Sequence, residues 1–275
     1  MRTRILTAGV LIPLVLAVLW WNPGGVGVFG VVGLLSLGMA WEFCRLFRAK
    51  GLPAGAWEWG VVAGASLAWA VRAAFLPSPE RVGDPWSGAI LLAVLLASGV
   101  RVILLGQTEG ATAYLGGVLL AAFVVGWCFA RSLLRLYALG GAGGVLWLLG
   151  TIWASDSAAY FVGRATGRRP FAPRLSPKKT WEGSVGGLLA ALLVGFLGAR
   201  YGLGMGLGWA LAGSVGIGVL APAGDLLESS WKRDAGVKDS GTWLPGHGGL
   251  LDRLDSLLLS LPFAVGLFWL EGRAG

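Results

Sequence analysis

Acidic residues at the ends of apolar segments are the side chains of this sequence best suited to chemistry. Asp225 and Glu228 lie three residues apart at the end of one apolar segment, and Asp252 and Asp255 lie three apart at the start of another. On a helix, this spacing places both members of a pair on one face. Asp156 ends a third apolar segment. An ionised Asp at bilayer depth costs roughly 2.5–3.5 kcal/mol on insertion scales, so such groups usually pair with cations or bind ions.

Two kinds of partner could neutralise these carboxylates. Simple salt bridges with Lys232, Arg233 or Arg253 are one alternative. Several acids that converge at one membrane face indicate a divalent-cation site instead. Because the ligands would all be oxygen atoms, with no cluster of Cys or His, the sequence favours Mg²⁺ or Mn²⁺ over zinc, and a second cation would also fit. The predicted metal ligands are Asp156, Asp225, Glu228, Asp252 and Asp255.

A basic segment lies between Arg164 and Gly183. Basic residues beside a membrane often anchor the chain or bind anionic lipid head groups. Here, however, Ser176-Pro177 can start a turn, and Thr180 can cap a helix that carries Glu182. An exposed helix N-terminus next to lysines can hold a phosphate. The predicted substrate-binding residues of this segment are Ser176, Lys178, Lys179, Thr180 and Glu182.

The segment before the last apolar stretch contains a Gly-Gly pair and the single histidine of the chain. Gly248 and Gly249 let backbone N–H groups approach an anion closely. A single loop histidine such as His247 is more often a structural hydrogen-bonding residue than a catalyst. A catalytic role for this histidine therefore needs support from other residues.

The composition is that of a membrane protein. Of the 275 residues, 56% are hydrophobic and only 13% are charged, whereas soluble domains average roughly 25% charged residues. The 15 tryptophans and 47 glycines agree with this class, because Trp gathers at membrane interfaces and Gly is frequent in membrane helices. The net charge of +8 indicates topology anchoring, and nucleic-acid binding is excluded because no soluble basic domain is present.

Nine apolar segments approach the roughly 20 residues that a membrane-spanning helix needs. No alternation typical of a barrel is present, so we expect an all-α, polytopic membrane protein. The first segment follows Arg2 and Arg4 without a small-residue cleavage site, and we expect it to be retained. The predicted spans are about 5–21, 26–47, 57–77, 88–106, 111–130, 142–162, 183–201, 206–224 and 254–271.

The distribution of Arg and Lys predicts the orientation. With nine spans and a cytoplasmic N-terminus, sixteen of these residues face the cytoplasm and six face the other side. Loops 163–182 and 225–253 would then be cytoplasmic. We expect residues 1–140 to form a scaffold for dimer or lipid contacts, and residues 141–275 to form the catalytic region.

The acids of residues 1–140 are expected to be solvated at the membrane interface, except Glu42, which lies inside the second predicted span and is expected to face the bundle interior. The spacings Gly140–Gly144 and Gly183–Gly187 weakly support close helix packing. The other acids of this half are Glu58, Glu80, Asp84 and Glu109.

The segment from Ser229 to Asp255 resembles the signature of the phosphatidate cytidylyltransferases, also called CDP-diacylglycerol synthases. That signature runs Ser-x-apolar-Lys-Arg, then Lys-Asp, then Pro-x-His-Gly-Gly and Asp-Arg-apolar-Asp. The sequence matches every spaced position except one, where Trp231 stands in place of an aliphatic residue or Phe. Ser176–Gly183 and the set Asp156, Tyr160, Gly163 and Gly167 are also similar. The strong resemblance covers residues 150–265, and the N-terminal half matches only in hydropathy.

The resemblance implies the reaction of CTP with phosphatidate to give CDP-diacylglycerol and pyrophosphate, a step of phospholipid biosynthesis. The lipid phosphate is already anionic, so the reaction needs charge neutralisation and positioning more than a strong base. The resemblance also implies a homodimer. The oxygen ligands favour Mg²⁺, and the count of basic residues predicts contact with membrane lipids and an active site on the cytoplasmic side of the inner membrane. Ser229, Gly248 and Gly249 would position the nucleotide. The implied catalytic residues are Asp225, Lys232, Arg233, Lys238, Asp239, His247, Asp252, Arg253 and Asp255.

Three alternatives remain at this point. A relative could use another lipid acceptor, such as an isoprenoid phosphate, or could be a CTP-dependent polyprenol kinase. An ion-coupled transporter should have related halves with acids near the midplane, but here the halves are unlike and the acids gather at one face. A non-catalytic scaffold would not need so many acids and bases in two short loops.

Overall fold

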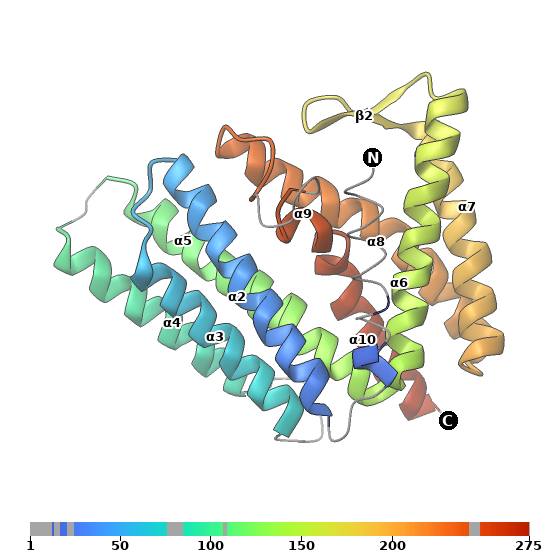
Figure 1. Ribbon diagram of the computed structural model, residues 1–275, viewed down its shortest axis with the longest axis horizontal. Helices are drawn as coiled ribbons and strands as arrows, with labels where there is room; N and C mark the ends of the chain where they lie inside the picture. The colour runs from blue at the N-terminus through green and yellow to red at the C-terminus, as the bar shows by residue number, and fades with distance from the viewer. Residues whose placement is uncertain are drawn as a thin grey trace. The chain divides into compact units, whose positions relative to one another are not determined.

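The computed structural model describes residue 13 and residues 17–20, 25–75, 85–106, 109–241 and 248–274. The chain divides into two compact units. The first unit comprises residues 1–134 and 234–253, and the second comprises residues 135–233 and 254–275. The first predicted span, 5–21, lies almost entirely outside the described residues. The described part of both units is mainly helical, in agreement with the predicted fold class (Figure 1).

The first unit is a helical bundle built around α3. Its helices are α2 (Val26–Ala49), α3 (Ala56–Phe75), α4 (Pro85–Leu104), α5 (Ala111–Ala122) and the π-helix η2 (Phe123–Arg131). Helix α3 contacts α2, α4, α5 and η2. The side chain of Trp69 on α3 is fully buried and packs against Gly126 of η2, where a Cβ atom would lie 3.1 Å from the Cα atom of Ser66. Gly126 therefore allows the two backbones to approach closely.

The second unit contains the remaining helices and one β-hairpin. Its elements are α6 (Ser132–Thr166), β1 (Pro170–Ala172), β2 (Ser176–Thr180), α7 (Trp181–Leu197), the π-helix η3 (Gly198–Gly202), α8 (Leu207–Asp234), α9 (Leu251–Leu254) and α10 (Leu257–Ala274). The unit boundaries fall inside α6, α8 and α9. Helix α6 is kinked at Gly141, whose φ of 60° and ψ of −160° are non-helical, a conformation that glycine adopts without a Cβ penalty.

Six helical stretches of the described chain are long and apolar enough to cross a membrane: Val26–Ala49, Trp86–Leu104, Ala111–Thr166, Trp181–Gly202, Leu207–Asp234 and Leu251–Gly272. The stretch Ala111–Thr166 has 56 residues, or about 84 Å at 1.5 Å per residue, against a hydrocarbon core of about 30 Å. It contains two predicted spans, 111–130 and 142–162, with the Gly141 kink between them. Helix α3, which corresponds to predicted span 57–77, is not among the six, and it carries Glu58, Arg72 and several tryptophans.

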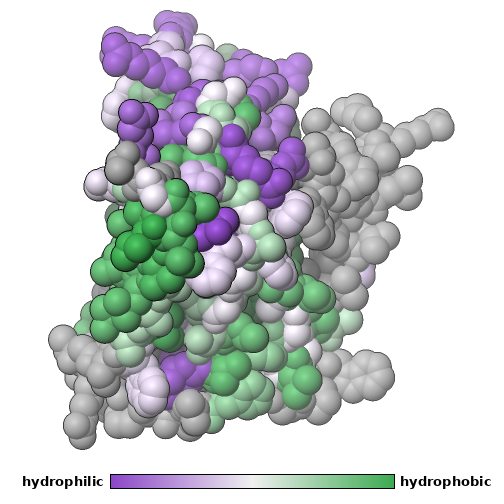
Figure 2. All heavy atoms as spheres, turned by 90° about the vertical axis from the view of Figure 1, so that its left-hand side faces the viewer, coloured by the Kyte–Doolittle hydropathy of each residue, from purple (hydrophilic) through white to green (hydrophobic). Residues whose placement is uncertain are grey.

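Large apolar side chains remain exposed in both units. Examples are Ile103 on α4, which is 78% exposed, and Leu193 on α7, which is 62% exposed. Figure 2 shows many of these exposed hydrophobic side chains gathered into a broad area on the face that it draws. Exposed apolar area of this kind marks a surface that contacts lipid or protein. Together with the apolar helices, it identifies a polytopic membrane protein.

The segment Ser176–Thr180 differs from its prediction. We expected Ser176-Pro177 to start a turn, but these residues belong to strand β2, which pairs antiparallel with β1 through Pro170–Thr180 and Ala172–Ser176. A two-stranded sheet has only edge strands, so the missing N–H of Pro177 is tolerated. The predicted cap is confirmed, because the Thr180 hydroxyl accepts a hydrogen bond of 3.2 Å from the backbone N–H of Gly183 at the start of α7.

Candidate active site

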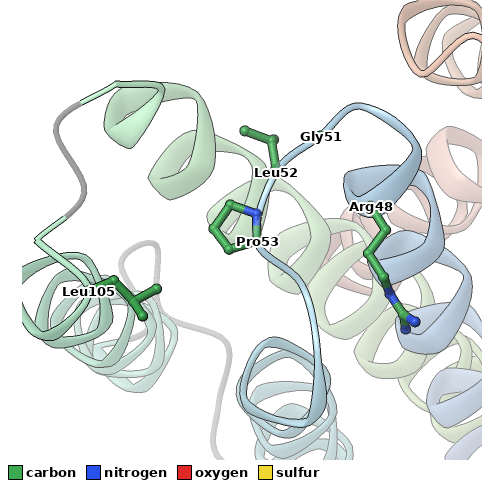
Figure 3. Close-up of a pocket in the computed structure, with 5 residues that line it drawn as sticks. All are labelled: Arg48, Gly51, Leu52, Pro53 and Leu105. Carbon is green, nitrogen blue, oxygen red and sulfur yellow. The ribbon is translucent and has the colours of Figure 1, made fainter.

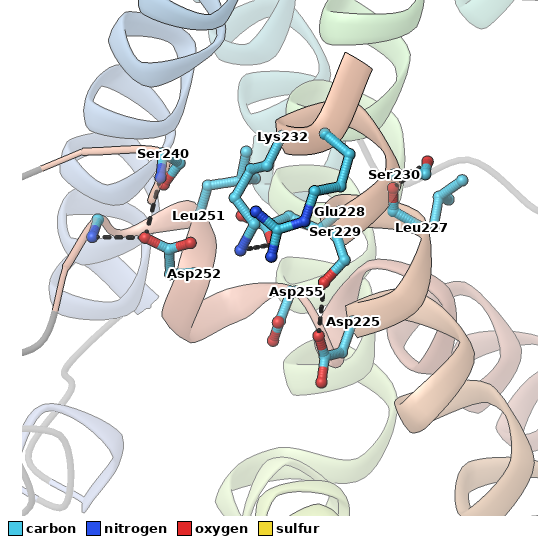
Figure 4. Close-up of polar contacts among 12 residues, drawn as sticks. Asp225, Leu227, Glu228, Ser229, Ser230, Lys232, Ser240, Leu251, Asp252 and Asp255 are labelled. Carbon is cyan, nitrogen blue, oxygen red and sulfur yellow. Dashed lines mark hydrogen bonds and ion pairs between the residues drawn. The ribbon is translucent and has the colours of Figure 1, made fainter. Parts of the chain in front are cut away.

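Three carboxylates of the second unit form a compact acidic group. Asp225 and Glu228 lie one turn apart on α8, and Asp255 lies between α9 and α10. One carboxylate oxygen from each lies within 4.8 Å of those of the other two. Figure 4 shows the side chains of Asp225 and Asp255 side by side. We call Asp225, Glu228 and Asp255 the acidic group.

The close approach of α8 to the segment around Asp255 depends on Gly224. A Cβ atom at this position would collide with the backbone carbonyl oxygen of Asp255. The backbone N–H of Ser256 also donates a hydrogen bond of 2.6 Å to Oδ1 of Asp255. Gly224 thus gives the room, and Ser256 helps to orient the carboxylate. Neither residue was singled out from the sequence, because the contact is made between distant segments.

Two lysines contact the acidic group. The Lys179 ammonium, which comes from strand β2, lies 2.6 Å from Oδ2 of Asp225 and donates to the carbonyl oxygen of Pro222 at 3.4 Å. Lys232 forms an ion pair with the fully buried Glu228 one turn earlier on α8. The Ser229 hydroxyl donates to Oδ1 of Asp225 at 3.4 Å (Figure 4). The predicted residues Lys179, Ser229 and Lys232 are therefore brought to the predicted acids.

Asp156 on α6 belongs to the same electrostatic neighbourhood. It interacts with the charges of Lys179 and Asp225 and with that of Asp255, and its side chain is exposed. When all four acids are ionised, their four carboxylates and the two ammonium groups that contact the acidic group leave two net negative charges. One bound divalent cation would balance these two negative charges.

Glycines of α7 set the distance between α7 and the part of α6 that carries Asp156. A Cβ atom at Gly187 would lie 2.9 Å from the carbonyl oxygen of Ser155, and one at Gly183 would lie 2.7 Å from that of Ala159. The Gly183–Gly187 spacing therefore marks a real close contact between helices. The spacing Gly140–Gly144 also marks a contact, because both residues pack against the ring of Phe268 on α10.

The remaining predicted residues of the hairpin and of the end of α8 lie as follows. The carboxylate of Glu182 accepts backbone hydrogen bonds from Arg168 at 3.1 Å and Arg169 at 3.3 Å, so it ties the start of the hairpin to α7. The Nε–H of Arg233 donates to the carbonyl oxygen of Leu175 in the hairpin turn at 3.4 Å. Ser176 is half-buried, and Lys178 is exposed on β2.

Asp252 lies in the first unit and is held by its own loop. Its Oδ2 accepts hydrogen bonds from the backbone N–H groups of Ser240, at 3.1 Å, and Gly249, at 2.8 Å (Figure 4). Helix α9 ends at Leu254, before Asp255. The prediction that Asp252 and Asp255 share one helical face is therefore wrong, because the short helix that carries Asp252 stops before the second acid.

Other predicted residues of the segment 234–253 also belong to the first unit. The side chains of Lys238, Asp239 and Arg253 are exposed. Gly248 has a φ of 84°, which favours glycine, and the N–H group of Gly249 donates to Asp252 rather than pointing into solvent. The position of His247 lies outside the described residues.

Glu42 on α2 is fully buried, which confirms that it faces the interior. Its two carboxylate oxygens accept three hydrogen bonds from the loop that carries Asp252, from the Ser240 hydroxyl at 2.7 Å and from the backbone N–H groups of Leu250 and Leu251 at 2.8 Å each. The sequence singled out Glu42 by its place inside an apolar segment. Its partners, about 200 residues away, could not be found in this way.

Glu58 on α3 corrects one prediction. We expected it to be solvated at the membrane interface, but only 1% of it is exposed. Its carboxylate accepts hydrogen bonds from the Tyr114 hydroxyl at 2.8 Å and the Gly55 N–H at 2.6 Å, and it lies 3.5 Å from the Nε atom of Arg101. Tyr114 and Arg101 come from neighbouring helices and Gly55 directly precedes α3, and together these partners satisfy a buried carboxylate. Glu80 and Asp84 lie outside the described residues, and Glu109 is exposed.

A separate cavity of the first unit, of about 470 Å³, is lined by Arg48, Gly51, Leu52, Pro53 and Leu105 (Figure 3). The guanidinium of Arg48 also lies over the ring of Trp41, 5.2 Å from its centroid. The lining contains no carboxylate. Among the described residues that line it, this cavity therefore has no acidic ligand like those of the acidic group.

Comparison with known proteins adds three findings. The profile of a family described as the cytidylyltransferase family matches residues 2–270. A phosphatidate cytidylyltransferase of Brucella suis is 34% identical over 277 residues, which cover 99% of this chain and 93% of that protein. One of Pseudomonas aeruginosa is 34% identical over 299 residues, which cover 99% of this chain and 98% of that protein. The similarity thus extends through the N-terminal half, where the sequence alone indicated only a match in hydropathy.

A third relative, a phosphatidate cytidylyltransferase of Bacillus subtilis, is 40% identical over 150 residues, which cover 54% of this chain and 56% of that protein.

Proposed function

This chain belongs to the cytidylyltransferase family, and we propose that it transfers the cytidylyl group of CTP to phosphatidate, giving CDP-diacylglycerol and pyrophosphate. The observation that carries this function is the similarity to phosphatidate cytidylyltransferases over 99% of the chain. The chain is thus a nucleotidyltransferase of phospholipid biosynthesis, built from membrane-spanning helices.

The reaction joins two polyanions. An oxygen of the lipid phosphate attacks the α-phosphorus of CTP, a new P–O bond forms, and the bond between the α-phosphorus and the bridging oxygen breaks to release pyrophosphate. The attacking oxygen is already ionised, so no proton has to be removed from it. The protein must instead neutralise charge and align the two phosphates.

The acidic group fits a divalent cation with oxygen ligands. Asp225, Glu228 and Asp255 offer three oxygens within 4.8 Å of one another, and the adjacent Asp156 adds a fourth carboxylate. Oxygen-only ligands favour Mg²⁺ or Mn²⁺, and we propose Mg²⁺ there. When bound, such a cation would neutralise phosphate charge and polarise the P–O bonds.

Lys179 and Lys232 would hold phosphate oxygens beside the acids. Both ammonium groups already lie beside carboxylates of the acidic group, so they are placed to contact a phosphate held by a cation bound there. Lys178, Arg233, Lys238 and Arg253 are proposed to bind the remaining phosphate oxygens of CTP or phosphatidate. Asp252, Gly248 and Gly249 are assigned to the reaction by the resemblance of the segment 229–255 to the family signature.

The arrangement in the membrane follows from the charge distribution. We propose nine spans, a cytoplasmic N-terminus, and cytoplasmic loops 163–182 and 225–253 in the inner membrane. CTP would then enter from the cytoplasm, and phosphatidate would enter sideways from the adjoining leaflet. A homodimer is proposed from the resemblance to the family.

The test is a transfer assay with the purified protein in detergent and Mg²⁺. Labelled CTP is offered with phosphatidate, with an isoprenoid phosphate or with a polyprenol, and lipid and water-soluble products are separated. We expect CDP-diacylglycerol and equimolar pyrophosphate from phosphatidate. A CDP-linked lipid formed from the isoprenoid phosphate but not from phosphatidate would indicate an enzyme that uses isoprenoid phosphates as acceptors. Release of CDP with the polyprenol would indicate a kinase. No CDP-lipid with Mg²⁺ or Mn²⁺ would contradict the proposal.

A further inference from the structure

The carboxylate of Glu42 on α2 contacts residues on both sides of the loop between Ser240 and Leu251. The Ser240 hydroxyl, before the loop, donates to Oε2 at 2.7 Å. The backbone N–H groups of Leu250 and Leu251, after the loop, donate to Oε1 and Oε2 at 2.8 Å each. All three partners are donors, so the carboxylate acts only as an acceptor in these contacts.

The surroundings of Glu42 are shaped to admit this loop. Gly38, one turn earlier on α2, leaves room for the side chain of Leu250. Gly249 lies so close that a Cβ atom there would be 2.7 Å from Oε1 of Glu42. Burial of an ionised carboxylate in an apolar helix is costly unless hydrogen bonds satisfy it. The loop backbone supplies these bonds, so the loop and Glu42 stabilise each other.

The same backbone groups also orient Asp252. The N–H of Ser240 and the N–H of Gly249 donate to its Oδ2 at 3.1 and 2.8 Å. Ser240 therefore binds Glu42 through its hydroxyl and Asp252 through its backbone. Gly249 directly precedes the two residues whose N–H groups bind Glu42. Any shift of the loop away from Glu42 would displace the donors that hold Asp252.

We infer that Glu42 is a positioning residue for the reaction, which acts through the loop to fix the carboxylate of Asp252. The inference rests on the proposed function and deepens it, because the role of Asp252 in cytidylyl transfer is part of that proposed function. It assigns to the N-terminal half a part in the chemistry rather than in scaffolding alone. Glu42 itself touches neither substrate nor metal in this assignment.

The test compares Glu42→Gln with Ser36→Ala, a matched control on α2. Ser36 is also buried, but its hydroxyl bonds the carbonyl oxygen of Val32 on its own helix at 2.7 Å. In Glu42→Gln, one amide orientation sets an NH₂ group against the N–H of Leu250, and the other sets it against the N–H of Leu251 and the Ser240 hydroxyl. We expect the kcat of Glu42→Gln to fall about 10- to 100-fold, the usual range for residues that orient a functional side chain without touching the substrate. We expect Ser36→Ala to keep the wild-type kcat.

Hydrogen exchange separates positioning from general stability. Amides of residues 248–256 should exchange faster in Glu42→Gln, while α3 and α4 keep wild-type exchange, and the loss of kcat should persist well below the Tm of the variant. Ser240→Ala should show a smaller loss of kcat. In the double variant, the two losses should be less than additive, because both act through one contact.

Two results would overturn the inference. One is unchanged kcat and unchanged exchange of residues 248–256 in a folded Glu42→Gln protein. The other is additivity of the two substitutions. If Glu42→Gln does not fold, a folded Ser240→Ala protein with wild-type kcat and exchange overturns it equally. Absence of CDP-lipid formation by the wild-type protein would instead refute the proposed function, and the exchange comparison would still decide whether Glu42 holds the loop.

Discussion

At the scale of single residues, the acids of the C-terminal half differ in what their carboxylates contact. Those of Asp225, Glu228 and Asp255 face one another, which is unfavourable unless cations lie between them. That of Asp252 accepts two backbone N–H groups, which fix its orientation. The first set therefore supports the proposed metal site, and Asp252 is an oriented single carboxylate.

The substitution Asp255→Asn tests the proposed metal site. It removes one negative ligand with little change in shape, and we expect the rate to fall by at least about 100-fold, since even groups that only orient ligands contribute 10- to 100-fold. The rate of pyrophosphate release is measured at increasing Mg²⁺ concentrations. It is also measured after a chelator has removed divalent cations from the protein. Asp234→Asn is the control, because Asp234 lies exposed at the end of α8, paired with Lys50. Near-wild-type activity of Asp255→Asn, or full activity of the chelated protein, would contradict this assignment.

At the scale of elements, close contacts between helices place the charged residues. Strand β2 brings Lys179 to Asp225 on α8, while its last residue, Thr180, caps α7. Helix α7 then packs against α6 along Gly183 and Gly187, beside the turn that carries Asp156. One hairpin and two glycines thus tie α7 to α6, which carries Asp156, and to α8, which carries Asp225 and Glu228.

The substitution Gly187→Ala should disturb this arrangement. Its Cβ atom would lie 2.9 Å from the carbonyl oxygen of Ser155, and overpacking of this kind costs typically about 1–3 kcal/mol. We expect a lower Tm and a lower rate. Gly150→Ala on α6 is the control, because a Cβ atom there meets no atom within 4 Å and Ala favours a helix. Thermal unfolding in detergent measures both, and an equal Tm for the two variants would argue against a tight α6–α7 contact.

At the scale of the whole molecule, the chain is a polytopic membrane protein of two units. The first unit includes the C-terminal segment 234–253 as well as the N-terminal helices, so that segment folds with residues far from it in sequence. Helix α2 and the loop that carries Asp252 are joined in this way through Glu42. The second unit contains the acidic group, and its α8 and α10 are broken neither at Pro222 nor at Pro262.

The proposed topology predicts which loops are reachable from each side. With nine spans and a cytoplasmic N-terminus, a cysteine at Arg174 in the hairpin should react with a membrane-impermeant thiol reagent only after the cells are opened. A cysteine at Gly275 should react in intact cells whose outer membrane is permeable. Labelling of Arg174→Cys from outside would contradict the cytoplasmic position of the loop. The buried Cys44 and Cys128 are replaced beforehand.

The sequence by itself determined the features that depend on neighbours along the chain. Hydropathy is a local property, so the membrane class, most helical segments and the division of the stretch 111–166 near Gly141 could be predicted. The shared face of Asp225 and Glu228 and the Thr180 cap follow equally from helix geometry. Only the tertiary structure decided contacts between segments far apart, such as Lys179 with Asp225, Glu58 with Tyr114, and Glu42 with Leu251. The physical reason is that a buried charged group needs hydrogen-bond donors or an opposite charge nearby, but its own position in the sequence does not specify which distant segment supplies them.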